Sequence, residues 1–319
     1  MARAKFSHLL GNAFLHIAIP LVLNTFGQLN TTWARRFARL LGAFVRICYR
    51  PGARLVRENL AIAFPQKSAT EREKILRKNF FHLMWAGVDF LRLLRHPERL
   101  EEMLENPHED LKAELPSQGV LCLPHLGSWE VLAQSICLSY PHCAAVAAVF
   151  DYDILNRTLE RSRSYRGLKL IPRQGAVRGC LNALEDGYCI GTLIDQNLSP
   201  RHGGIFVDFF GLPATASPLP ALLHRRTGIP LLSGACVHLP DGKYRFLRKN
   251  LNIPAEATDA QVTQSIISAN EELIRQYPEQ YVWMYRRWSS IPENASPELV
   301  ARYPAYAKVK PAHKGRKLP

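Results

Sequence analysis

Short apolar runs alternate with segments of helical periodicity through the central and C-terminal parts of the chain. The helical segments cover residues 128–139, 154–166, 176–186, 216–228 and 259–277. Strands that alternate with helices predict an α/β domain with a mixed, largely buried central sheet flanked by helices. The expected strands are Val120–Leu123, Ala144–Phe150, Leu168–Ile171, Cys189–Ile194, Ile205–Phe209, Ile229–Val237 and Tyr244–Leu247.

The chain before this alternating region is predicted to be helical. Residues 54–105 have helical periodicity, with a break at Pro65 and Ser68. Ser68 and Glu71 have the spacing of a capping box, in which each residue bonds the backbone N–H of the other. We therefore expect a helix that begins after Ser68 and runs to about Arg95.

Residues 9–29 contain no Lys, Arg, Asp or Glu. This uncharged segment is long enough to cross a bilayer. Asn12, His16, Pro20 and Asn24 interrupt this segment, so its hydrophobicity is poor for a spanning helix. A cleaved signal peptide is disfavoured because no small-residue cleavage site follows. Whether the segment spans the membrane or lies on it is left open.

The next segment predicts a helix at a membrane surface. Its aromatic and aliphatic residues recur at helical spacing, and its arginines gather largely on another face. This pattern is typical of a helix that lies on an anionic bilayer. The alternative is a core-packed helix with a solvated basic face. The apolar series is Trp33, Phe37, Leu40, Phe44 and Cys48, and the basic series is Arg35, Arg39, Arg46 and Arg50.

These patterns divide the chain into three parts. Residues 1–53 form the membrane-associated helical segment, and residues 54–301 form the α/β domain. Residues 302–319 contain six Lys or Arg, three Pro and no acidic residue. This composition predicts a loose basic tail.

Composition narrows the class of protein. The 319 residues are 47% hydrophobic and 21% charged, which is typical of a globular chain. The formal net charge of +14 favours anionic partners. No helix-turn-helix, zinc finger or RNA-binding signature accompanies it, so nucleic acid is the least favoured partner. Seven scattered cysteines without a CxxC pair indicate free thiols, and no clustered His/Cys set predicts a metal.

The strongest local candidate for chemistry is His125 with Glu130. His125 lies in the turn after an apolar strand that ends at Pro124, and a helix is expected to begin near Ser128. In a strand-to-helix turn, Glu130 can reach back to the imidazole. That arrangement makes a His general base oriented by a carboxylate. No GxSxG nucleophile is present, so the nucleophile would be a substrate hydroxyl.

Five motifs in order, over roughly residues 54–290, resemble the bacterial lipid A biosynthesis acyltransferases of the lysophospholipid acyltransferase superfamily. His125 and Glu130 match the H-x4-D/E hallmark of that superfamily, which implies a glycerolipid acyltransferase-like fold. The other four motifs are Arg57–Pro65, Leu193–Gln196, Ile205–Gly211 and Pro278–Trp288.

The resemblance implies roles for individual residues. His125 would be the base on the acceptor hydroxyl, with Glu130 as its charge partner. Arg163 aligns with a residue that the family needs for activity. Asp195 ends a strand beside the site, where a buried carboxylate can orient a His, an Arg or a sugar hydroxyl. By the same resemblance, Gln196 and Arg173 bind substrate.

The implied reaction moves a fatty acyl group from acyl carrier protein to a hydroxyl of a lipid A precursor or related glycolipid. It would take place at the cytoplasmic face of the bacterial inner membrane, with no metal or bound cofactor. Acyl carrier protein is acidic, so the basic chain would favour encounter with it.

Two departures from the family pattern leave an alternative open. Residues 149–153 are acidic where the family has an arginine, and Tyr285 stands in place of a His. The alternative is a membrane-surface lipid-binding protein of the same fold whose catalysis has been altered.

Overall fold

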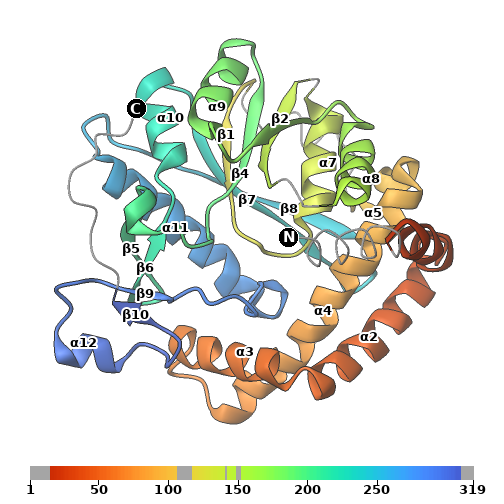
Figure 1. The fold of residues 1–319 in the computed structure, drawn as a ribbon, viewed down its shortest axis with the longest axis horizontal. Helices are drawn as coiled ribbons and strands as arrows, with labels where there is room; N and C mark the ends of the chain where they lie inside the picture. The colour runs from red at the N-terminus through yellow and green to blue at the C-terminus, as the bar shows by residue number, and fades with distance from the viewer. Residues whose placement is uncertain (1–14, 106–116, 141, 149–151, 310–319) are drawn as a thin grey trace, which may run out of the picture.

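The computed structural model describes residues 15–105, 117–140, 142–148 and 152–309. A six-stranded sheet forms its centre, in the order β3-β2-β4-β1-β7-β8 (Figure 1). All neighbours are parallel except β7 and β8, which confirms the mixed sheet. The strands are β1 (Val120–Leu123), β2 (Cys143–Ala147), β3 (Lys169–Pro172), β4 (Cys189–Leu193), β7 (Leu231–His238) and β8 (Tyr244–Asn250).

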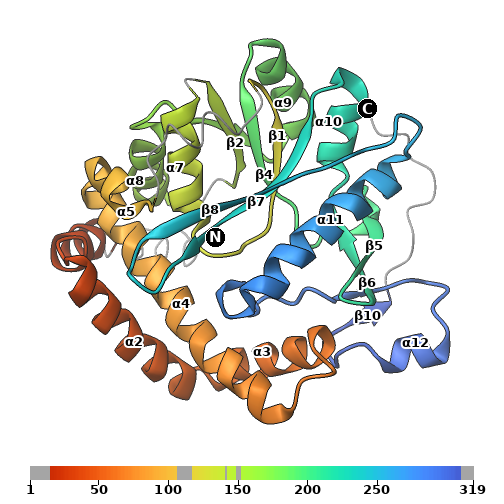
Figure 2. The same ribbon diagram turned by 180° about the vertical axis from the view of Figure 1, so that it is seen from behind.

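Alternate residues of the central strands pack against different helices, as the two-residue period of a strand requires. Leu121 and Leu123 of β1 share a core with α7, whereas Val120 and Cys122 share a core with α9, α10 and α11. Figures 1 and 2 show α7 and α8 on one flank of the sheet and α10 and α11 on the other. These helices are α7 (Trp129–Ser139), α8 (Asp153–Ser164), α9 (Ala176–Glu185), α10 (Leu219–Thr227) and α11 (Asp259–Gln276).

One predicted strand lies outside the central sheet. β5 (Ile205–Phe209) forms a separate antiparallel hairpin with β6 (Leu212–Ala216). Phe210 and Gly211, which join them, both have positive φ, as a tight hairpin turn requires. Because β6 occupies residues up to Ala216, the helix predicted over 216–228 begins later, at Leu219.

The first part of the basic tail is ordered against the domain, so the prediction of a loose tail is wrong for residues 302–309. Tyr303 is buried, and its hydroxyl donates to the carbonyl of Pro213 at 2.7 Å. β10 (Lys308–Val309) pairs with β9 (Ser290–Ile291), after α12 (Pro297–Ala301). The basic, proline-containing composition of this segment carries no information on these contacts, so the sequence did not predict them. Residues 310–319 lie outside the described part of the chain.

The N-terminal region folds into helices that wrap one side of the domain (Figures 1 and 2). Residues 15–26 are helical. The capping box is confirmed, because the Ser68 hydroxyl accepts from the N–H of Glu71 and the Glu71 carboxylate accepts from the N–H of Ser68. The helices are α2 (Thr31–Cys48), α3 (Arg50–Ala63), α4 (Ala69–Arg95) and α5 (Leu100–Met103), with the 3-10 turn η1 (Pro97–Arg99) between the last two.

Helix α2 packs through its small residues and exposes several of its large apolar ones. Ala34, Ala38 and Gly42 are buried on the face of α2 that packs against the domain. Leu40 and Phe44, by contrast, are 72% and 63% exposed. Among the described helices, none combines the length and apolar character needed to cross a membrane.

Candidate active site

The site is built on the turn between β1 and α7. Gly127 in this turn has φ +66°, and a Cβ there would lie 2.0 Å from the carbonyl oxygen of Cys236, so only glycine fits. The N–H of Gly127 donates to the carbonyl of Gln280, and the carbonyl of His125 accepts from the N–H of Val282. The segment at 280–282 therefore holds the turn in place from outside the sheet.

His125 is bonded twice to Asp195. Its Nδ1 lies 2.6 Å from Oδ1 of Asp195, and its backbone N–H donates to Oδ2 at 2.8 Å. Asp195 follows β4, which pairs in parallel with β1, so the ends of both strands meet at one edge of the sheet. Because a carboxylate only accepts, Nδ1 carries the proton and the lone pair of the neutral ring lies at Nε2.

Burial and charge act in opposite directions on this pair. Burial alone would lower the pKa of His125, but the charge of Asp195 and its hydrogen bond outweigh burial and raise that pKa above its ordinary value. Burial would likewise raise the pKa of the Asp195 carboxyl, but the His125 charge and hydrogen bonds lower it. In this pair, the Asp195 carboxylate at Nδ1 stabilises the protonated form of the His125 base.

Glu130 lies in the first turn of α7 and bonds an arginine. Its two oxygens accept from Nε and Nη2 of Arg163 at 3.1 and 2.5 Å. The expected contact of Glu130 with the imidazole is thus replaced, because Asp195 occupies Nδ1 and α8 brings Arg163 to Glu130. The ring of Trp129 lies edge-on to His125, with centroids 5.0 Å apart.

An apolar cavity of about 250 Å³ opens beside these groups. His125, Glu130, Arg163 and Arg173 line it, and its remaining walls come from α7 and from one face of the sheet. His125 and Arg173 closely follow β1 and β3, so these polar groups lie at the carboxyl-end edge of the sheet, at one end of an apolar space. Wall residues include Leu121, Leu123, Ala133, Ile136, Cys143, Ala145, Leu168, Cys189, Gly191 and Leu193.

All six predicted site residues come together. Four of them line the cavity, and Asp195 lies behind His125. Gln196 bridges the group, since its amide lies 3.3 Å from Nε2 of His125 and its oxygen 3.5 Å from Nη2 of Arg173. In the described part of the chain, no three His, Cys, Asp or Glu side chains gather as metal ligands would.

Two supporting residues were missed as members of the site. Arg287 is buried, donates to Oδ1 of Asn197 at 2.9 Å, and helps to lower the pKa of Asp195 by its charge. The Tyr285 hydroxyl accepts from the N–H of Asn197 at 3.0 Å. Both lie in the Pro278–Trp288 motif, which was the signal that could have revealed them.

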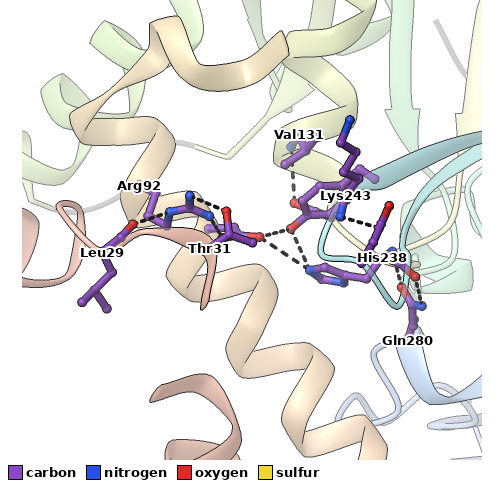
Figure 3. A network of polar contacts seen from close by, with 11 residues as sticks. Leu29, Thr31, Arg92, Val131, His238, Lys243 and Gln280 are labelled. Atoms are coloured by element: carbon purple, nitrogen blue, oxygen red, sulfur yellow. Dashed lines mark hydrogen bonds and ion pairs between the residues drawn. The ribbon is translucent and has the colours of Figure 1, made fainter. Parts of the chain in front are cut away.

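A buried polar network supports the turn from the side of α4 (Figure 3). Asp89 pairs with Arg92 at 2.6 Å and accepts from the Tyr244 hydroxyl at 2.7 Å. The Tyr244 hydroxyl also lies 2.7 Å from Nε2 of His238, and the Ser128 hydroxyl accepts from the N–H of Val131 as the N-cap of α7. Arg92 also donates to the carbonyl of Leu29 and to the Thr31 hydroxyl, as seen in Figure 3.

Gln280 connects this network to the site. It accepts from the N–H of His238 and donates to the His238 carbonyl at 2.8 and 2.9 Å, and its own carbonyl accepts from Gly127. Burial lowers the pKa of His238, so this ring is neutral. The network therefore joins the N-terminal helices to the turn that carries His125.

Comparison with known proteins identifies relatives over most of the chain. Residues 3–290 match the family model described as bacterial lipid A biosynthesis acyltransferase. The lipid A biosynthesis palmitoleoyltransferase of Escherichia coli K12 is 27% identical over 80% of this chain and 85% of its own. The lauroyltransferase of that organism is 27% identical over 76% and 80%. The phosphatidylinositol mannoside acyltransferase of Mycolicibacterium smegmatis is 24% identical over 78% and 84%.

Proposed function

The chain belongs to the bacterial lipid A biosynthesis acyltransferase family, and from that premise we propose that it moves a fatty acyl group from acyl carrier protein to a glycolipid hydroxyl. The observation that carries the proposal is the His125–Asp195 pair at the polar end of an apolar cavity. An acyl chain fits such a cavity, because burial of each CH2 group contributes about 0.8 kcal/mol. The thioester carbonyl would then lie beside the imidazole.

In this reaction, Nε2 of His125 takes the proton of the acceptor hydroxyl. The oxygen attacks the thioester carbonyl, and a tetrahedral oxyanion forms. When the C–S bond breaks, the imidazolium returns the proton to the thiolate, so the ester and the free thiol of the carrier are released. Asp195 stabilises the imidazolium between these two transfers, as the carboxylate of a hydrolytic triad does.

Glu130 and Arg163 have a separate role in this proposal. Glu130 uses Nε and Nη2 of Arg163, which fixes the guanidinium at the cavity wall and leaves Nη1 for the substrate. A fixed cation beside the thioester stabilises negative charge that develops on the oxyanion. The catalytic unit we propose is therefore His125 with Asp195, and Glu130 acts through Arg163.

We also propose that the protein works at the cytoplasmic face of the inner membrane. The support is the outer face of α2, where Trp33, Leu40 and Phe44 are exposed next to arginines. Exposed aromatic and aliphatic side chains beside cations suit the boundary between headgroups and acyl chains. The basic surface would also attract acyl carrier protein and anionic lipids.

The acceptor is a lipid A precursor or a related glycolipid. The relatives include both a lipid A biosynthesis palmitoleoyltransferase and a phosphatidylinositol mannoside acyltransferase. The acidic stretch at 149–153, where the family has an arginine, favours an acceptor with less negative charge there. Residues 149–151 lie outside the described part of the chain.

The test is transfer from labelled acyl carrier protein to extracted bacterial glycolipids. We expect His125→Ala to abolish transfer, while His142→Ala, which changes an exposed histidine that does not line the cavity, keeps it. Mass analysis of the product identifies the acceptor. If the wild-type protein binds glycolipid but transfers nothing to it, the altered lipid-binding protein is the better interpretation.

A further inference from the structure

A second cavity lies against the N-terminal half of α2. It shares no lining residue with the cavity beside His125. It has a volume of about 330 Å³ and is lined by Arg35, Arg36 and Arg39 with Thr31, Thr32 and Asp241. Three cations face one carboxylate there, so the cavity has a net positive charge. No residue of the proposed acyl transfer lines it.

The three guanidinium groups are each held over an aromatic ring. Arg36 lies 5.0 Å from the ring centroid of Trp33, Arg39 lies 5.6 Å from Phe81, and Arg35 lies 5.3 Å from Trp85. The attraction between a cation and a ring face uses none of the guanidinium N–H groups as hydrogen-bond donors. The arginines are therefore ordered without using up their donors.

Within the described ranges, none of the three arginines forms an ion pair with a carboxylate. Asp241 accepts from the N–H of Lys243 at 3.0 Å. Arg35 donates from Nη1 to the carbonyl of Pro240 at 2.6 Å, and its buried Nε has no partner in the described part of the chain. Unpaired, pre-positioned guanidinium groups bind phosphate oxygens in a bidentate manner.

We propose that this cavity, which we call the α2 arginine site, binds the phosphate of an anionic phospholipid headgroup. The lipid source is favoured because Trp33, whose ring contacts Arg36, is itself exposed, as is Leu40 on the same helix. A phosphate held at the α2 arginine site would leave these apolar side chains at the depth of the acyl chains. The inference specifies the membrane side of the proposed function and does not depend on acyl transfer.

The experiment compares two charge-matched variants in vesicle binding. Arg36→Gln with Arg39→Gln removes two charges from the α2 arginine site. Arg50→Gln with Arg54→Gln removes two exposed charges nearby, outside the cavity lining. Flotation uses full-length protein with vesicles of phosphatidylglycerol in phosphatidylcholine, and circular dichroism verifies that each variant is folded.

We expect the site variant to weaken vesicle binding about tenfold more than the control variant, because charge-assisted hydrogen bonds are lost only in the former. Inorganic phosphate, at constant ionic strength, should compete with vesicles for the wild type and not for the site variant. Equal losses in the two variants would overturn the proposal. Thermal stabilisation by inorganic phosphate, with vesicle binding unchanged in the site variant, would overturn the lipid assignment.

Discussion

Asp195 controls both the position and the basicity of His125, since one oxygen bonds the ring and the other bonds the backbone. In Asp195→Asn, the charge that raises the pKa of His125 is lost, and burial then lowers that pKa. In the proposed reaction the neutral ring is the active base, so the fall in kcat/KM on acidification should move to lower pH. The maximal rate should fall by about 10²- to 10⁴-fold, because the imidazolium loses its partner.

A pH–rate profile of both proteins checks this prediction. Glu130→Gln is the matched control, because it removes a carboxylate that bonds Arg163 and not His125. It should lower the rate without moving the acid limb. If the acid limb moved in Glu130→Gln and stayed in place in Asp195→Asn, the assignment of the His125 partner would be wrong.

Glu130 is close to His125 in the sequence, whereas Asp195 is not, and this difference explains which partner of His125 the sequence could predict. H-x4-E is a local spacing, and it correctly marked two groups of one cavity. The partner of His125 is 70 residues away, and the contact depends on the parallel pairing of β1 with β4. Spacing alone carries no information on which strands are neighbours.

At the scale of elements, the β1–α7 turn is the most constrained part of the site. Gly127→Ala places a Cβ against the carbonyl of Cys236 and adopts a positive φ. Gly175→Ala is the matched control, since its φ is also positive but its Cβ would meet nothing within 4 Å. The control should lose about 1–2 kcal/mol of unfolding free energy, and Gly127→Ala clearly more.

Urea denaturation measures both losses. The loss in Gly127→Ala should be accompanied by loss of transfer in the protein that remains folded, because the turn carries His125. Equal destabilisation of the two variants would mean that the turn can shift away from Cys236 at little cost.

The direction of the strands predicts which residues would limit the length of an acyl chain bound in the cavity. Parallel strands end at the edge beside His125, so Leu123 and Leu193 lie near the mouth, and Cys143 and Cys189 lie deeper. Ile136 lies about two turns along α7 from Trp129. Ile136→Phe should shorten the preferred acyl chain, and Ile136→Ala should lengthen it.

Each variant is given a mixture of acyl carrier protein thioesters of different chain length. Mass analysis of the products then measures both the expected shortening and the expected lengthening in one assay. A general loss of packing would lower the amounts of all products alike. Opposite shifts of the preferred chain length in the two variants therefore exclude that explanation. Unchanged product lengths in two active variants would exclude Ile136 from the floor of the acyl site.

Apolar patterning predicted the succession of central strands and helices along the chain, most clearly at β1 and β7, where every residue is buried. It did not predict the separate β5–β6 hairpin, since a short apolar run does not specify its partner strand. Nor did it predict the ordered residues 302–309, which are held by the short β9–β10 pair and by side-chain contacts such as that of Tyr303 with Pro213. Element type follows local periodicity, whereas pairing depends on the whole chain.

For the whole molecule, the buried polar network and the exposed face of α2 give the N-terminal helices two roles. Their inner side joins the turn of His125 through Arg92, Asp89 and Tyr244 (Figure 3). Their outer side carries Leu40 and Phe44, which are largely exposed. An apolar face of this kind should hold the protein on a bilayer by burial of apolar surface as well as by charge.

The wild-type protein should therefore resist release from membranes by moderate salt, which screens only the charges. Leu40→Gln with Phe44→Gln should weaken vesicle partition at least about tenfold, since burial of each side chain contributes about 1.5–3 kcal/mol, and should make the protein salt-releasable. Val300→Gln, an exposed apolar residue on α12, is the control and should change neither property. Release of the wild type by salt alone would show that charge, without apolar burial, accounts for its attachment to the membrane.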